Sequence, residues 1–156
     1  MSEERMSVIV TTIASLLFPF IFIFSFYVIM HGHLTPGGGF QGGAIGASAI
    51  VMLIVAYGAR EVYKKASDEK LSIFESVGGL LFVLVGILGF ILAASFLSNF
   101  LVGEPIFGNI PPFGSNPGEL NSGGILPLLN IAVGMKVIGG LASVVLIMAL
   151  AGGEKK

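Results

Sequence analysis

The stretch His31-Gly32-His33-Leu34-Thr35-Pro36-Gly37-Gly38-Gly39-Phe40-Gln41-Gly42-Gly43-Ala44-Ile45 decides how this chain folds, because it separates two long apolar segments. Five of the chain's 23 glycines fall between Gly37 and Gly43. Pro36 fixes φ and lacks an amide donor. Each of the consecutive glycines costs a helix about 1 kcal/mol relative to alanine. The sequence therefore predicts a sharp turn here, or a place where another group approaches the backbone closely.

The letters Gly37-x-Gly39-x-x-Gly42 also match the dinucleotide-binding fingerprint, with Glu61 near the position of a ribose-binding acid. That fingerprint requires a preceding strand and a surrounding soluble βαβ unit. Long apolar segments flank the glycines here instead, and no lysine follows that would make a phosphate-binding loop. The context therefore argues against a nucleotide site.

Composition indicates a membrane protein. Of the 156 residues, 54% are apolar and only 11% are charged, against about 25% charged in soluble domains. The net charge of −1 gives no reason to expect a nucleic-acid partner. The absence of cysteine excludes disulfides, thiol catalysis and iron–sulfur ligation by this chain. With only two histidines, we expect no metal site made by the chain itself.

Four apolar segments reach the roughly 20 residues that are needed to cross a bilayer. We therefore expect a single all-α transmembrane domain spanning 1–156, with the second helix preceded by the glycine-rich break. The expected helices cover about 7–30, 40–59, 73–102 and 126–151.

Basic residues predict the orientation of these helices. They lie before the first helix, between the second and third, and at the end of the chain, as Arg5, Arg60, Lys64, Lys65, Lys70, Lys155 and Lys156. The connections 31–39 and 103–124 contain no lysine or arginine. The positive-inside rule then places both termini in the cytoplasm and makes 103–124 an external loop rich in glycine and proline. Its length suggests a cover over something rather than a bare linker.

Lys136 is the one basic residue that does not follow this rule. It lies eight residues past Leu128, about 12 Å into the fourth expected helix, where a lysine costs at least about 2.5 kcal/mol. Either it extends outward along its own helix or it meets a polar partner. Glu75, placed at the cytoplasmic start of the third helix, is expected to be too far away. Lys136 should therefore point at a carboxylate, carbonyl or water supplied by another polypeptide.

Other polar or unusual residues add candidates for an ion path. His31 and His33 end the first helix and either relay protons or cap carbonyls. Asn130 precedes Lys136 on the same helix. Phe40, with glycines on both sides, either wedges against a neighbouring helix, plugs an aqueous vestibule or simply anchors the turn. No residue is a candidate for catalysis.

The pattern Gly32-His33-x-x-Pro36-Gly37-Gly38-Gly39-Phe40-x-Gly42-Gly43 between two membrane helices resembles the MnhB family, whose members are small subunits of Mrp-type multisubunit sodium/proton antiporters. The resemblance covers nearly the whole chain. It implies a small multi-pass subunit without enzymatic activity of its own, in the plasma membrane of a prokaryote. It also implies a hetero-oligomer with other antiporter-module subunits, which moves sodium ions and protons and needs no cofactor in this chain.

The same module recurs in respiratory complexes of anaerobic archaea, namely membrane-bound hydrogenases and their sulfur-reducing relatives, which couple ferredoxin oxidation to ion pumping. Gln41 and Lys136 depart from the pattern of stand-alone antiporters and favour this branch. Iron–sulfur and nickel–iron centres would then lie in other subunits. Two alternatives stay open: the MnhB-type subunit of a stand-alone antiporter, and a purely structural spacer. A spacer, however, has no use for Lys136.

Overall fold

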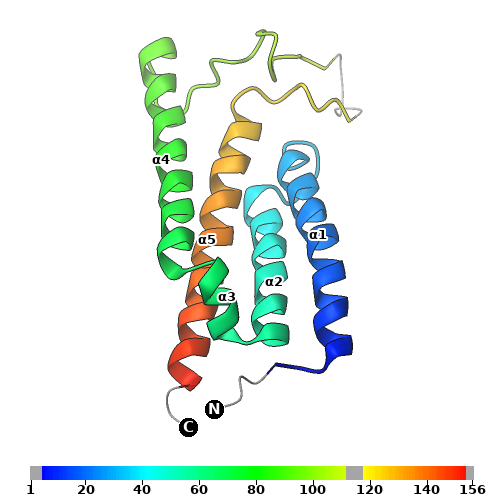
Figure 1. Cartoon of the computed structure of the whole chain (residues 1–156). Coiled ribbons are helices and arrows are strands. Elements are labelled where there is room, and N and C mark those ends of the chain that lie inside the picture. Colours follow the sequence, from blue (N-terminus) through cyan, green and yellow to red (C-terminus); the bar gives the residue numbers. More distant parts are fainter. Residues whose placement is uncertain (1–4, 112–117, 154–156) are drawn as a thin grey trace.

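Residues 5–111 and 118–153 are described here in a computed structural model of the chain. Four helices in these ranges are long and apolar enough to cross a membrane, which confirms the predicted all-α fold with four candidate spans. They are α1 (Val8–Met30), α2 (Gly39–Tyr57), α4 (Asp68–Ala93) and α5 (Leu126–Gly153), and a short helix α3 (Ala59–Lys65) connects α2 to α4 (Figure 1).

The third span differs from its expected range of 73–102, because α4 begins earlier and ends earlier. Ser67 precedes the helix, and Asp68 and Glu69 occupy its first turn, where negative charge is favourable at the positive end of the helix dipole. The helix ends at Ala93, and the next residue, Ala94, adopts a left-handed conformation with φ of 56°. The apolar residues after it belong to the loop, so hydropathy alone misplaced both ends.

The four long helices lie in a single row in the order α4, α5, α2, α1 (Figure 1). The extensive contacts are those between neighbours in this row. Accordingly, a larger share of the apolar 18-residue stretch is buried in α2 (44%) and α5 (33%) than in α4 (22%) and α1 (17%). A single row leaves both of its broad faces open, and large apolar side chains are exposed along them. Exposed apolar surface of this extent marks contact with lipid or with other membrane subunits.

Small residues on two sides of α2 allow it to lie between α1 and α5. A Cβ atom added at Gly43 would lie 2.9 Å from the Gly134 carbonyl oxygen of α5. One added at Gly42 would lie 2.9 Å from the Ser25 carbonyl oxygen of α1. The buried Ser25 hydroxyl also donates to the Gly42 carbonyl oxygen at 2.7 Å. These backbone approaches show that small residues of α2 allow it to pack closely against both neighbouring helices.

Two asparagines stabilise the loop between α4 and α5. The Asn99 side chain accepts a hydrogen bond from the Ile125 amide at 2.8 Å and donates to the Gly123 carbonyl at 3.2 Å. The Asn121 side chain accepts from the Phe107 amide at 2.6 Å. These bonds hold the described parts of the loop together at the end of the row that carries the turn between α1 and α2 (Figure 1).

Candidate functional site

Lys136 meets an acidic partner within its own chain. Its Nζ lies 3.0 Å from Glu75 Oε1, so the expectation that Glu75 is out of reach, and that the partner must come from another polypeptide, is wrong. Because α4 begins at Asp68, Glu75 lies about 10 Å inside the helix rather than at its start. Lys136 lies about 15 Å from the first residue of α5. Both charges therefore sit well inside apolar helices.

A second polar pair fixes the register of α4 against α5. The Ser143 hydroxyl donates to the Asp68 carboxylate, nearer than the first pair to the end of the row that carries α3. In both helices the two polar residues are seven apart, which places them on one face two turns from each other. Since the helices are antiparallel neighbours, Asp68 opposes Ser143 and Glu75 opposes Lys136. The two pairs form a polar seam between the spans.

Glycines beside the seam bring the two backbones close enough for the ion pair to form. A Cβ atom at Gly78 would lie 2.7 Å from the Lys136 amide nitrogen, and one at Gly139 would lie 2.9 Å from the Glu75 amide nitrogen. Larger residues at either position would separate α4 from α5. The side chains nevertheless stay accessible, with Lys136 55% and Glu75 35% exposed in the isolated chain. The pair thus opens onto one face of the row.

The glycine-rich turn forms the second polar centre, and Asn130 belongs to it. Asn130 Oδ1 accepts a hydrogen bond from the Gly39 amide at 3.4 Å, at the start of α2. Gly38 precedes the helix with φ of 77°, a conformation that favours glycine, and its added Cβ would lie 2.8 Å from Asn130 Oδ1. Gly37 is also left-handed, with φ of 147°. Gly38 has no side chain that could cap the start of α2, and the Asn130 side chain of α5 therefore takes that role.

The other candidate residues around this turn differ from Asn130 in their exposure and contacts. Phe40 is 62% exposed and so does not pack inside its own chain. Gln41 folds back over the turn, since a Cβ atom at Gly37 would lie 2.4 Å from its Oε1. Pro36 is exposed. The exposed ring at the start of α2 is free to contact a neighbouring subunit or lipid.

The two histidines lie between the turn and the loop. His31 stacks edge-on against Tyr27 with ring centroids 4.4 Å apart. His33 lies beneath the returning loop, because a Cβ atom at Gly123 would lie 3.0 Å from its Cδ2. His31 Nδ1 and both ring nitrogens of His33 are buried, and each has no hydrogen-bond partner among the described residues.

The structure does not bring all the candidates together. Asn130 joins the glycine-rich turn, whereas Lys136, six residues further along α5, faces α4. Glu75 was rejected as a partner of Lys136, and Asp68 was not identified, because the start of α4 was placed too late. The sequence did contain a signal for the correct helix start, because Ser67 followed by two acids is typical of one. A helix that begins there carries Glu75 further inside the span, to the level of Lys136. Within residues 5–111 and 118–153, no cluster of three or more possible ligand side chains could hold a metal ion.

Comparison with known proteins shows which family this chain resembles. Residues 9–143 match the domain related to the MnhB subunit of Na+/H+ antiporters. The chain is 37% identical over 100 residues to a Na+/H+ antiporter subunit of Bacillus subtilis, in a match that covers 64% of this chain and 69% of that protein. It is also 37% identical over 125 residues to an uncharacterised protein of Methanocaldococcus jannaschii, covering 78% of this chain and 44% of that protein.

A solved structure shares the fold. A chain in the structure of the membrane-bound sulfane sulfur reductase (MBS), an archaeal respiratory membrane complex, superposes with a TM-score of 0.72 at 33% identity. The match covers 96% of this chain but 60% of that one, so this chain spans less than two thirds of both archaeal relatives. Its four apolar helices and its relatives make it a multi-pass membrane protein of a prokaryote. The chain belongs to the family of domains related to the MnhB subunit of Na+/H+ antiporters.

Proposed function

We propose that this chain is a non-catalytic membrane subunit of an Mrp-type sodium/proton antiporter module, and that it takes part in ion movement. The observation that carries the proposal is the ion pair between Glu75 and Lys136 inside two apolar spans. Charges inside membrane spans are rare and usually mark ion pathways or proton relays. A subunit that only fills space between larger subunits gains little from such a pair.

The exposure of the pair indicates what surrounds it. Hydrocarbon offers no hydrogen bonds, so a half-exposed ammonium and carboxylate facing lipid would keep a large desolvation cost. A neighbouring subunit or a water-filled cavity on that face of the row would remove this cost. We therefore expect other subunits of the antiporter module to cover the face of α4 and α5 that carries the pair.

The pair can take part in transport by exchanging its counter-ion. A sodium ion or proton that binds the Glu75 carboxylate replaces the Lys136 ammonium, which moves to a carbonyl, carboxylate or water on the adjacent subunit. The return of Lys136 to Glu75 then releases the cation. Each step keeps the carboxylate neutralised, which lowers the cost of its location inside the membrane. His31 and His33, with buried ring nitrogens at the other end of the row, are candidates for moving protons between water and the module.

The larger assembly that best fits this chain is a respiratory complex. The supporting observation is that a chain of the sulfane sulfur reductase, an archaeal respiratory membrane complex, superposes on 96% of this chain with a TM-score of 0.72 at 33% identity. In such a complex, iron–sulfur centres, and nickel–iron centres in a hydrogenase, belong to other subunits, and this chain holds no cofactor. The second candidate is the MnhB-type subunit of a stand-alone antiporter, which the Bacillus relative favours.

The test is purification of the tagged full chain from its native membranes in mild detergent, with mass spectrometry of the proteins that accompany it. We expect antiporter-module subunits together with the redox subunits of a sulfur reductase. Antiporter subunits without redox subunits would support the stand-alone alternative. A monodisperse monomer that transports ions by itself in liposomes would contradict the proposal.

A further inference from the structure

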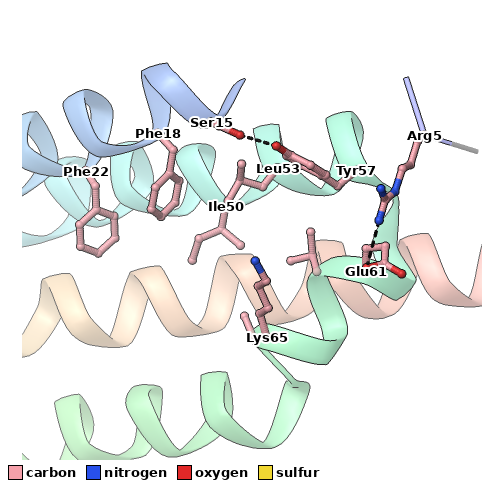
Figure 2. A pocket seen from close by; sticks show the side chains of 11 residues that line it. Arg5, Ser15, Phe18, Phe22, Ile50, Leu53, Tyr57, Glu61 and Lys65 are labelled. Atoms are coloured by element: carbon pink, nitrogen blue, oxygen red, sulfur yellow. Dashed lines mark hydrogen bonds and ion pairs between the residues drawn. The ribbon is translucent and has the colours of Figure 1, made fainter. Parts of the chain in front are cut away.

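A cleft of about 630 Å³ lies at the end of the row that carries α3, between α1, α2 and the short helix. Figure 2 shows the residues that line it. Its walls are apolar along the spans and charged at the end, and they comprise Arg5, Ser15, Phe18, Phe22, Ile50, Leu53, Tyr57, Glu61, Val62, Lys65 and Ala66. The volume lies within the range of about 300–1,000 Å³ that is common for ligand sites.

The apolar part of the cleft extends deep along α1. Phe22 lies about 21 Å along the helix axis from Val8, which is about two thirds of a bilayer core of roughly 30 Å. The rings of Phe18 and Phe22 stack with centroids 5.7 Å apart, and Ile50 and Leu53 of α2 lie beside them (Figure 2). This part suits a long, flexible hydrocarbon chain better than a compact water-soluble ligand.

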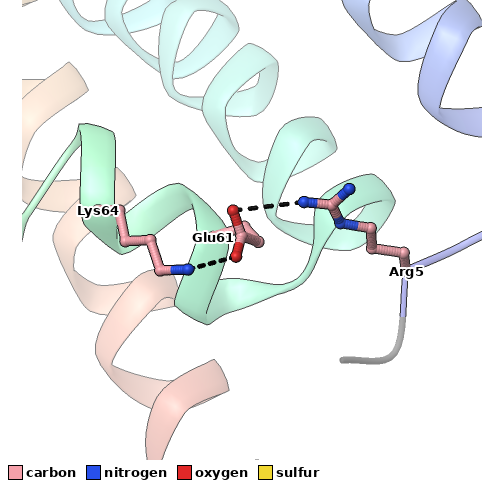
Figure 3. A network of polar contacts seen from close by, with 3 residues as sticks. All are labelled: Arg5, Glu61 and Lys64. Carbon is pink, nitrogen blue, oxygen red and sulfur yellow. Dashed lines mark hydrogen bonds and ion pairs between the residues drawn. The ribbon is translucent and has the colours of Figure 1, made fainter. Parts of the chain in front are cut away.

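Among the described residues, the side chains at the mouth of the cleft include more positive than negative charges. Arg5 Nη2 lies 3.4 Å from Glu61 Oε2, and Lys64 Nζ lies 2.5 Å from Glu61 Oε1, so one carboxylate is shared by two cations (Figure 3). Lys65 extends from the end of α3 toward Ile50 (Figure 2), and its ammonium forms no ion pair with any residue in the described parts of the chain. An ammonium beside an apolar cleft attracts an anionic group.

We propose that this cleft binds an anionic phospholipid. Its phosphate lies between Lys65 and Arg5, and one acyl chain lies against Phe18 and Phe22. The change from charge to apolar wall along the cleft matches the change from headgroup to hydrocarbon in a lipid. The end of the row where basic residues and α3 meet the spans is also where a headgroup layer would lie. A helix of a partner subunit would fit the apolar wall but would leave Lys65 without an anion.

Quenching of tryptophan fluorescence by brominated lipid tests the proposal directly, because the chain contains no tryptophan. The full chain carrying Phe18→Trp is reconstituted into phosphatidylcholine vesicles with a small fraction of phosphatidylglycerol brominated on its acyl chains. Phe20→Trp is the matched control, since Phe20 lies at nearly the same depth on α1, is 64% exposed and does not line the cleft. Phe22→Trp provides a second reporter inside the cleft.

We expect stronger quenching of the cleft reporters than of Phe20→Trp, and only with the anionic lipid. Adding Lys65→Gln should lower the apparent association constant of that lipid about five-fold, the effect of one basic residue at a membrane surface. Arg60→Gln removes a basic residue of α3 that does not line the cleft and should change the constant much less. Equal quenching of the cleft and control reporters would overturn the proposal, as would equal effects of Lys65→Gln and Arg60→Gln.

Discussion

Removing one member of the Glu75–Lys136 pair should destabilise the protein more than removing both. Lys136→Met leaves the Glu75 carboxylate without its counter-charge inside an apolar span. Glu75→Gln likewise leaves the Lys136 ammonium without its counter-charge inside an apolar span. An uncompensated charge at this depth costs about 2–3 kcal/mol. For a protein of this size, that corresponds to a fall in Tm of about 4–12 °C.

The double variant should recover most of this loss, because neither charge remains unpaired. We expect it to melt within about 2–4 °C of the unchanged protein, which corresponds to about 1 kcal/mol. The coupling free energy from the double-mutant cycle should therefore be favourable and about 3–5 kcal/mol, at or above the upper end of the range of about 0.5–3 kcal/mol that is usual for residues in contact.

The assay is the loss of the folded particle on heating, followed by fluorescence-detected size-exclusion chromatography of tagged chain solubilised from membranes. Glu69→Gln is the control, since Glu69 is an exposed acid of the first turn of α4 and should change stability by less than about 0.5 kcal/mol. Additive losses in the double variant would refute the coupling of the two charges.

Three further predictions concern the rest of the row. Gly43→Ala should lower the amount of folded chain in membranes, because the new Cβ would lie 2.9 Å from a carbonyl of α5, whereas Gly152→Ala meets nothing within 4 Å and should have no effect. Asn130→Leu removes the side chain that accepts a hydrogen bond from the first amide of α2, and should lower the stability by about 1 kcal/mol in the same thermal assay. Phe40→Ala should leave the thermal stability unchanged, because the ring is 62% exposed, but should lower sodium-coupled proton movement by the assembled complex. Phe24→Ala removes a ring of similar exposure elsewhere and should not lower it.

The sequence predicted the helical class and the four spans because these depend on length and hydropathy, which are local properties. In the structure α1 ends at Met30 and α2 begins at Gly39, on either side of Pro36. The short helix α3 was missed because its charged residues were read only as a cytoplasmic connection. The end of α4 at Ala93 was missed because apolar residues continue past it. No local sequence pattern predicts the left-handed conformation of Ala94 that follows the helix.

The candidate site was predicted in part. Lys136 was identified by its charge inside an apolar segment. Identifying its partner, however, required the depth of Glu75 in a different helix, α4. An error of five residues in the start of α4 moved Glu75 by about 8 Å along the helix axis, enough to hide the pair. The role of Asn130 as a cap for α2 depends on the packing of α5 against that helix, which one sequence does not reveal.

Participation of the Glu75–Lys136 pair in coupled ion movement can be measured in the assembled complex. Sodium-dependent proton movement is followed with a pH-sensitive dye in membrane vesicles that contain the complex with the double variant Glu75→Gln and Lys136→Met. This variant leaves no unpaired charge, so loss of activity cannot be attributed to a destabilised chain. We predict normal assembly with most of the sodium-dependent proton movement lost. Transport at the normal rate and with the normal sodium dependence would contradict a role for the pair, and the chain would then be a structural spacer.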